Sequence, residues 1–240
     1  MGETILMNIS EYKYRTELHA HTNPASACSN FTPEEVIKRY ADIGFDSIVI
    51  SNHFYPGSPF RDDKKKCIEE YLRDYQQAIE EGNKAGINVI FGCELRFEEN
   101  FNDYLIFGID PEFLDFAYDS MPDGIAEFSS RFRSESTLII QAHPFRDGAV
   151  PMPAEYLDGV EAFNLHPGHN SRVAVAAKYA KENDLIVTGG TDFHHEGHQG
   201  MTALLTKELM KTSHDVARVL KSRDYLIEIG GAIVMPYGNL

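Results

Sequence analysis

The sequence predicts an α/β fold with mostly parallel strands arranged as a barrel. Short apolar runs rich in β-branched residues alternate with amphipathic segments, as expected for parallel strands joined by crossover helices. Five of these runs end in a histidine or an acidic residue. Because a barrel gathers the carboxyl ends of its strands at one rim, these polar residues would meet there. A length of 240 residues suits one domain, which we predict over residues 1–240.

The first half of the chain contains four strand candidates and two helices. Thr32 supplies a helix cap, followed by Pro33 and early acids, and this helix is expected to end near Gly44. A second helix is predicted over 62–85, where apolar residues recur at helical spacing. The expected strands are YRTELHAHT (14–22), DSIVISNHF (46–54), INVIFGCELRF (87–97) and DYLIFGI (103–109).

The second half repeats the alternation. Residues 111–134 are expected to be helical or irregular, SRVAVAAKYAKEN (171–183) forms an amphipathic helix, and a last helix is capped near Ser213. The expected strands are STLIIQAHPF (136–145), GVEAFNL (159–165), DLIVTGGTDFHH (184–195), MTALLT (201–206) and DYLIEIG (224–230).

Composition narrows the class of protein. Hydrophobic residues make up 42% and charged residues 25% of the chain, values of an ordinary globular domain. The formal net charge of −15 disfavours binding of long nucleic acids, whose affinity depends on neutralising phosphates. No apolar run approaches the roughly 18 residues of a membrane span. The first residues lack the features of a secretion signal, and three cysteines do not suggest a disulfide framework, so we expect a cytoplasmic protein.

The histidines and acids predict a metal site. His19 and His21 are two residues apart in a predicted strand and so point the same way, as do Asp192 and His194. Imidazole nitrogen and carboxylate oxygen suit Zn, Mn and Fe ions, and the donors are too many for one four-coordinate ion. We therefore expect two or three divalent ions. The strand ends concerned carry His19, His21, His53, Glu94, His143, Asp192 and His194.

These motifs resemble the polymerase and histidinol phosphatase (PHP) family. The resemblance runs through ELHAHT, VISNHF, GCELRF, QAHPFR and TGGTDFHH, over about residues 14 to 196. It implies a distorted (β/α)7 barrel and a trinuclear metal site that hydrolyses phosphoesters. It also implies ligands for each ion: His19, His21, Glu94 and Asp192 for the first; Glu94 and His143 for the second; His53 and His194 for the third.

Two positions depart from the family pattern. Where many members have a histidine after the Glu motif, this chain offers Asp103, which is either a ligand of the second ion or a capping acid at a strand start. Where the family often has another ligand after the first motif, this chain has ASACSN, so Cys28 or Asn30 takes that place. A cysteine ligand would favour zinc or iron. Its alternative is a small buried thiol.

Further residues are candidates for roles around the metals. Arg146 is predicted to clamp phosphate, with a structural ion pair as the alternative. His195 and His198 would shuttle protons or remain solvated. Second-rank candidates are Arg15 and Arg96 beside ligand strands, Glu161 and Asn164 as residues that orient ligands, and His166 and His169, which line the pocket or lie in an exposed turn. His214 is expected at the surface.

Three functions fit these observations. The first is metal-dependent hydrolysis of a small phosphomonoester by metal-activated hydroxide, which needs no protein nucleophile. The second is amide or deaminating hydrolysis, since barrel amidohydrolases also use His-x-His; they commonly bridge their metals with a modified lysine, where this chain has Glu94. The third is a catalytically silent metal-binding domain. A small phosphorylated substrate is the expected partner, and the oligomeric state is left open.

Overall fold

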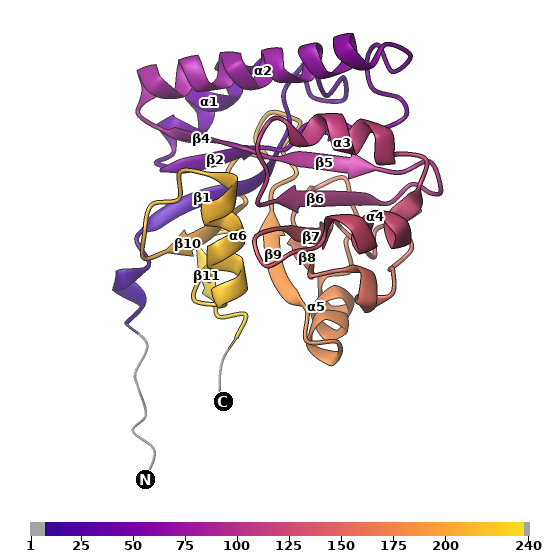
Figure 1. Cartoon of the computed structure of the whole chain (residues 1–240). Coiled ribbons are helices and arrows are strands. Elements are labelled where there is room, and N and C mark those ends of the chain that lie inside the picture. The colour runs from indigo at the N-terminus through magenta and orange to yellow at the C-terminus, as the bar shows by residue number, and fades with distance from the viewer. Residues whose placement is uncertain (1–7, 238–240) are drawn as a thin grey trace.

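The computed structural model describes residues 8–237 and contains two six-stranded sheets flanked by helices (Figure 1). The first sheet has the strand order β12-β11-β10-β1-β2-β4. Its strands are β1 (Tyr14–Ala20), β2 (Ser47–Ile50), β4 (Asn88–Phe91), β10 (Thr202–Thr206), β11 (Leu226–Ile229) and β12 (Ala232–Val234).

The second sheet has the order β3-β5-β6-β7-β8-β9. Its strands are β3 (His53–Phe54), β5 (Cys93–Arg96), β6 (Asp103–Phe107), β7 (Leu138–Gln141), β8 (Gly159–Asn164) and β9 (Ile186–Gly190). Most of these residues are buried, which explains their continuous apolar runs.

Two sequence runs that we predicted as single strands cross from one sheet to the other. Residues 46–54 divide into β2 and β3, and residues 87–97 divide into β4 and β5 at Gly92. A Cβ at Gly92 would lie 2.3 Å from Cγ1 of Val49, so only glycine permits this close approach of neighbouring strands. The two sheets therefore adjoin along these breaks.

The α/β fold is confirmed, but the expectation of mostly parallel strands is wrong. Five strand pairs are parallel and five are antiparallel. One cause is chain length between strands, because the six residues 97–102 between β5 and β6 are too few for a parallel crossover. Within residues 8–237 no continuous hydrogen-bond ladder closes the barrel. An isolated parallel bridge links Ala20, at the end of β1 in the first sheet, to Phe193, which follows β9 of the second sheet.

The helices cover the outer faces of the sheets. Thr32 caps the first helix as predicted and forms a capping box with Glu35, and Thr212 with Asp215 forms another at the last helix. α1 and α2 pack side by side, with α2 against β4, while α5 packs on β8 and β9 (Figure 1). The helices are α1 (Pro33–Asp42), α2 (Lys64–Ala85), α3 (Phe113–Ser120), α4 (Gly124–Phe132), α5 (Val173–Glu182) and α6 (Ser213–Ser222); two short 3-10 turns are Ile9–Glu11 and Ala154–Tyr156.

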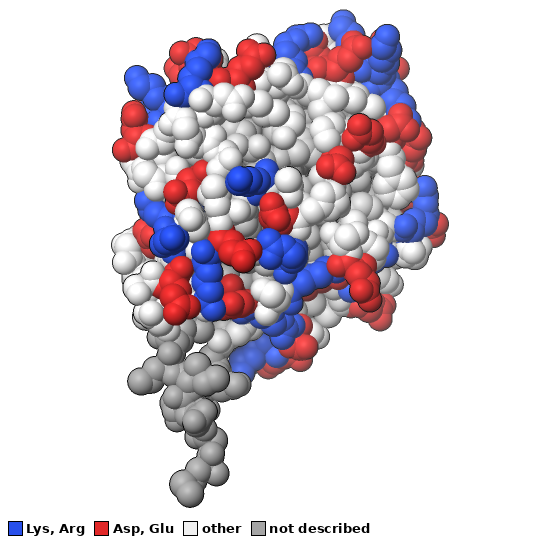
Figure 2. Space-filling model, turned by 60° about the vertical axis from the view of Figure 1, so that its left-hand side comes forward, with Lys and Arg blue, Asp and Glu red and all other residues white. Residues whose placement is uncertain are grey.

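The surface carries charges of both signs. On the face drawn in Figure 2, acidic and basic side chains are interspersed, and neither sign forms a continuous patch. No helix within residues 8–237 is both long enough and apolar enough to cross a bilayer.

Candidate metal centre

The predicted ligand residues converge at the boundary between the two sheets. His19 lies in β1 of the first sheet and His21 directly after it, whereas His53 and Glu94 belong to β3 and β5 of the second. The other three follow strands of the second sheet: His143 after β7, and Asp192 and His194 after β9. The strand ends thus deliver donors from both sheets to one place, as the sequence predicted.

Four buried side chains surround a first point. Nε2 of His19 lies 3.2 Å from Oε1 of Glu94 and 3.5 Å from Oδ1 of Asp192. Nε2 of His21 lies 3.4 Å from Oε2 of Glu94 and 3.4 Å from Oδ1 of Asp192. Donors bound tetrahedrally to one ion at about 2.0–2.2 Å are about 3.3–3.6 Å from one another. The separations of Asp192 from the two histidines match that requirement, and His19, His21 and Asp192 form one candidate group, towards which Glu94 turns a different oxygen to each histidine.

The donor atoms lack other partners. Nε2 of His19, Nε2 of His21 and both carboxylate oxygens of Glu94 are buried and form no hydrogen bond with any of residues 8–237. Buried polar atoms are rarely left unpaired, because each costs about 1–3 kcal/mol. Convergent, unpaired nitrogen and oxygen donors fit divalent metal ions, so the residues present fit the group that the sequence predicted.

Neighbouring side chains fix the orientation of the ligands. Nδ1 of His19 donates to Oε1 of Glu161 at 2.8 Å, and this contact holds the ring with Nε2 towards the cluster. Nδ1 of His21 lies 3.1 Å from Oγ of Ser26. Asn164 donates to Oε2 of Glu161 at 3.0 Å and to Oδ2 of Asp192 at 3.3 Å. Glu161 and Asn164 thus stand where residues that orient ligands were expected.

A second group consists of His19, Glu94 and His143, whose donor atoms lie within 4.8 Å of one another. Nε2 of His143 is 3.2 Å from Oε1 of Glu94, so that oxygen faces both His19 and His143. Asp103 also lies within 4.8 Å of donors on His53 and Glu94. Its carboxylate is simultaneously bound by Arg96 and Arg146.

A third group consists of His21, His53 and His194. Nδ1 of His53 lies 2.6 Å from Oε2 of Glu94, and Nδ1 of His194 lies 3.2 Å from Oδ1 of Asp192. Sγ of Cys28 is 3.1 Å from Nε2 of His194. Cys28 is an exposed residue at the cavity, so the expectation of a buried thiol is wrong. Asn30, the other residue of that segment, is bound to the backbone of His194 through its own N–H.

The carboxylates give the centre a strong preference for positive charge. Burial acts to lower the pKa of His19, but Glu161, Asp192 and Glu94 outweigh it and raise that pKa well above its usual value. By contrast, burial and the neighbouring His194 and His53 hold the pKa of His21 well below its usual value. Burial opposes ionisation of Cys28, yet hydrogen bonds with His194 and His53 lower the pKa of its thiol to about 6.

Two of the candidate ligands have unusual backbones. His143 has φ of 31° and Asp192 has φ of 53°, values in the left-handed region that L-residues seldom adopt. Such conformations persist where the surrounding structure holds them, and they concentrate at functional sites. Both residues immediately follow buried strands, where the turn redirects the side chain into the cluster.

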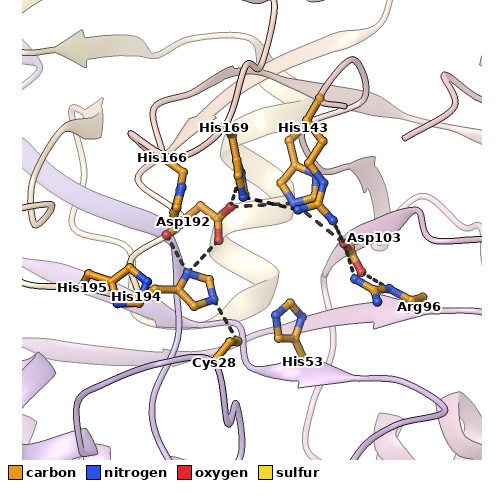
Figure 3. Close-up of a pocket in the computed structure, with 11 residues that line it drawn as sticks. Cys28, His53, Arg96, Asp103, His143, His166, His169, Asp192, His194 and His195 are labelled. Carbon is orange, nitrogen blue, oxygen red and sulfur yellow. Dashed lines mark hydrogen bonds and ion pairs between the residues drawn. The ribbon is translucent and has the colours of Figure 1, made fainter. Parts of the chain in front are cut away.

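A cavity of about 260 Å³ opens above the cluster (Figure 3). His166, His169 and His195 line it from the loops after β8 and β9. Arg96 and Arg146 line it as well, and Nη1 of Arg146 lies 3.4 Å from Nε2 of His169. Burial lowers the pKa of His166 to about 4. The cavity is lined by Cys28, His53, Arg96, Asp103, His143, Arg146, His166, His169, Asp192, His194 and His195.

His169 was only a secondary candidate in the sequence analysis, but it lies at this cavity. Nδ1 of His169 lies 3.3 Å from Oδ2 of Asp192, so this imidazole belongs to the centre rather than to an exposed turn. Its signal was the position of NLHPGH directly after a strand of the same sheet. Arg15 and His214 lie elsewhere, paired with Glu228 and Asp110 respectively. His198 does not line the cavity but stacks edge-on with His195.

The fold and the centre define an α/β protein with buried His, Glu and Asp clusters able to hold metal ions. The model of the PHP domain matches residues 17–231, and the chain belongs to this family. Comparison with curated proteins by sequence returned no match.

Solved structures share the fold at low sequence identity. A two-domain protein from Bacteroides vulgatus, containing a predicted PHP-like metal-dependent phosphoesterase, has a TM-score of 0.60 and 17% identity over 90% of this chain; the match spans only 64% of that protein. A candidate metal-dependent phosphoesterase from Bifidobacterium adolescentis has a TM-score of 0.51 and 16% identity, covering 87% and 96% of the two chains. An amidohydrolase from Chromobacterium violaceum with bound sulfate and no metal has a TM-score of 0.54 and 16% identity, covering 92% and 98%.

Proposed function

We propose that this protein is a metal-dependent phosphoesterase that hydrolyses a small phosphomonoester. The observation that carries the proposal is the arrangement of the cavity. The candidate ligands His53, His143, Asp192 and His194 line it, and so do the guanidinium groups of Arg96 and Arg146. Metal ions together with arginines are the groups that bind phosphoryl oxygens best.

Each metal ion would be held by its own set of side chains. His19, His21, Glu94 and Asp192 would hold the first, Glu94 and His143 the second, and His53 and His194 the third, with Cys28 as a further ligand. Bound ions would lower the pKa of a water molecule towards about 7 and neutralise charge on the phosphoryl group. The mixed donor set suits Zn, Mn or Fe.

The protein's own groups would position and protonate the substrate. Arg146 would hold phosphoryl oxygens, because its side chain is 24% exposed and lines the cavity. His195, which also lines the cavity, would give a proton to the leaving-group oxygen. The cavity of about 260 Å³ favours a small substrate over a long nucleic acid.

The alternatives differ in what the cavity must recognise. One similar structure is named an amidohydrolase, and it contains bound sulfate. A neutral amide would gain little from two guanidinium groups, which is why we favour a phosphoester. A catalytically silent metal-binding domain would need no cavity above the metals. We place the protein in the cytoplasm, where its three free cysteines would remain reduced.

The test is hydrolysis of an aryl phosphate by metal-stripped protein refilled separately with Zn, Mn and Fe. We expect turnover to return with at least one metal and to be lost in Asp192→Ala, whose side chain faces both His19 and His21. Arg15→Gln, far from the cavity, should retain it. Turnover that survives in Asp192→Ala would overturn the mechanism, and silence of the fully loaded protein towards a broad set of phosphomonoesters would favour the non-enzymatic alternative.

A further inference from the structure

Asp103 is buried between two arginines. It is the first residue of β6, directly opposite Arg96 in the antiparallel pair of β5 and β6. Nε of Arg96 donates to Oδ1 at 2.7 Å and a terminal nitrogen donates to Oδ2 at 2.8 Å, giving a two-pronged ion pair. NH2 of Arg146, from the loop after β7, donates to Oδ2 at 3.2 Å. Both oxygens are therefore engaged by guanidinium groups.

The same carboxylate stands further from the nearest histidine of the second group. Nε2 of His143 is 3.9 Å from Oδ2 of Asp103, whereas it is 3.2 Å from Oε1 of Glu94. The short contacts of Asp103 thus go to the arginines. Unlike Glu94, whose oxygens both lack hydrogen bonds, Asp103 has no unsatisfied oxygen that calls for a cation.

The exposure of the three side chains indicates which of them a ligand in the cavity could contact. Asp103 is 1% exposed, whereas Arg96 and Arg146 are 20% and 24% exposed and line the cavity. Two guanidinium groups repel each other unless an anion lies between them. With Asp103 behind them, both guanidinium groups line the cavity beside the candidate metal ligands, and Nη1 of Arg146 also lies 3.4 Å from Nε2 of His169.

We propose that Asp103 is a positioning residue that holds Arg96 and Arg146 together as a two-arginine site for a tetrahedral oxyanion, and that it is not a metal ligand. In an enzyme of the proposed function, this oxyanion is the phosphoryl group of the substrate; that identity rests on the proposed function. The pair and its buried carboxylate together carry one net positive charge, which an oxyanion would neutralise.

The test measures binding of inorganic phosphate to manganese-loaded protein by calorimetry, alongside metal content by elemental analysis. Asp103→Asn keeps the shape of the side chain but turns an amide N–H towards one guanidinium. We expect phosphate affinity to fall by about tenfold or more, since charge-assisted hydrogen bonds carry this much. Metal content should remain unchanged. Arg15→Gln removes an equally exposed, ion-paired arginine outside the cavity and should leave both quantities unchanged.

Two results would overturn the proposal: loss of a metal equivalent in Asp103→Asn, or unchanged phosphate affinity with full metal content. Should Asp103→Asn fail to fold, Arg96→Gln and Arg146→Gln replace it. Each should weaken phosphate binding, and the double variant should lose less than the product of the two, because both side chains depend on one carboxylate; independent effects would contradict the proposal. Phosphate binding is measured without turnover, so its dependence on Asp103 can hold even where the hydrolysis assay fails.

Discussion

Glu161 joins two ligands from different sheets. Its Oε1 accepts the Nδ1–H of His19 at 2.8 Å, and its Oε2 accepts the backbone N–H of His143 at 3.1 Å. An ionised carboxylate only accepts, so Nδ1 of His19 is the donor in this pair and Nε2 is the nitrogen that would bind a cation. Glu161 therefore sets both the tautomer of one ligand and the position of the other.

Glu161→Gln should weaken metal binding by about 10- to 100-fold. Glutamine has one acceptor oxygen, so either His19 or His143 would lose its partner. The measurement is competition with a chelator of known affinity. Glu155→Gln, which makes the same change on an exposed residue, is the control. Equal affinities for Glu161→Gln and the unmodified protein would contradict this role.

Gly190→Ala should disturb the same pair from the backbone side. A Cβ there would lie 2.2 Å from Oε1 of Glu161 and 2.5 Å from Cβ of His19. We expect weaker metal binding and a loss of about 1–3 kcal/mol in the free energy of unfolding. At Gly189 the nearest atom to a new Cβ lies at 3.1 Å, so Gly189→Ala should cost less. Chelator competition and denaturant unfolding check both effects, and equal costs at the two positions would contradict the crowding argument.

Asp74 should make stability depend on pH. It lies buried in α2, and its Oδ2 accepts from Oγ1 of Thr22 and the N–H of Ala25, both at 2.9 Å. Burial raises its pKa. The folded state therefore favours the protonated form, and the stabilising contribution is complete below the unfolded pKa of about 3.9 and is lost as pH rises through the raised folded pKa.

Asp74→Asn removes this ionisation while keeping an oxygen for both donors. The stability of the natural protein relative to Asp74→Asn should be highest at low pH and fall as pH rises, in urea unfolding over a pH series. Asp74→Ala should lose about 1–3 kcal/mol at every pH, because both donors are left unpaired. A stability difference between the natural protein and the Asp74→Asn variant that does not change with pH would contradict the raised pKa.

Cys28 should contribute sulfur to a bound ion. With its Sγ 3.1 Å from Nε2 of His194, a shared ion would bring both atoms into one coordination shell. Cobalt-loaded protein should then show the near-ultraviolet charge-transfer absorption of a thiolate ligand. Cys28→Ser should lose this absorption, and Asn30→Ala should keep it. Identical spectra for the Cys28→Ser and unmodified proteins would return Cys28 to a hydrogen-bonding role.

The sequence located the residues that cluster as candidate metal ligands, because their positions depend on local pattern. Each follows an apolar run, and period-two alternation brings His19 and His21 to one place. Whether two strands pair parallel or antiparallel does not depend on local pattern, because it depends on the end of the sheet from which the chain enters the second strand. The short link from Arg96 to Asp103 could have predicted an antiparallel pair, but the long path from Phe107 to Leu138 gives no such signal.

Other features depend on contacts that no local pattern contains. The break at Gly92 follows from the approach of Val49 in another strand. The engagement of Asp103 by Arg146 joins residues 43 positions apart in the sequence. The proximity of His169 to Asp192 likewise requires the turns after two strands to meet. These contacts arise from the packing of the strands. The sequence therefore predicted which residues are candidates for the site, but not which of them contact one another.

The boundary between the sheets would give a bound metal ion a mechanical role. His19 and His21 stand on one sheet and Glu94 on the other, while residues 8–237 provide no continuous ladder between them. A cation bound by donors from both sheets would act as a cross-link and would stabilise the folded state in proportion to the logarithm of its concentration. Removing the ions should therefore weaken the junction between the sheets more than either sheet itself. On heating, the two sheets should then unfold in separate transitions rather than in one cooperative transition.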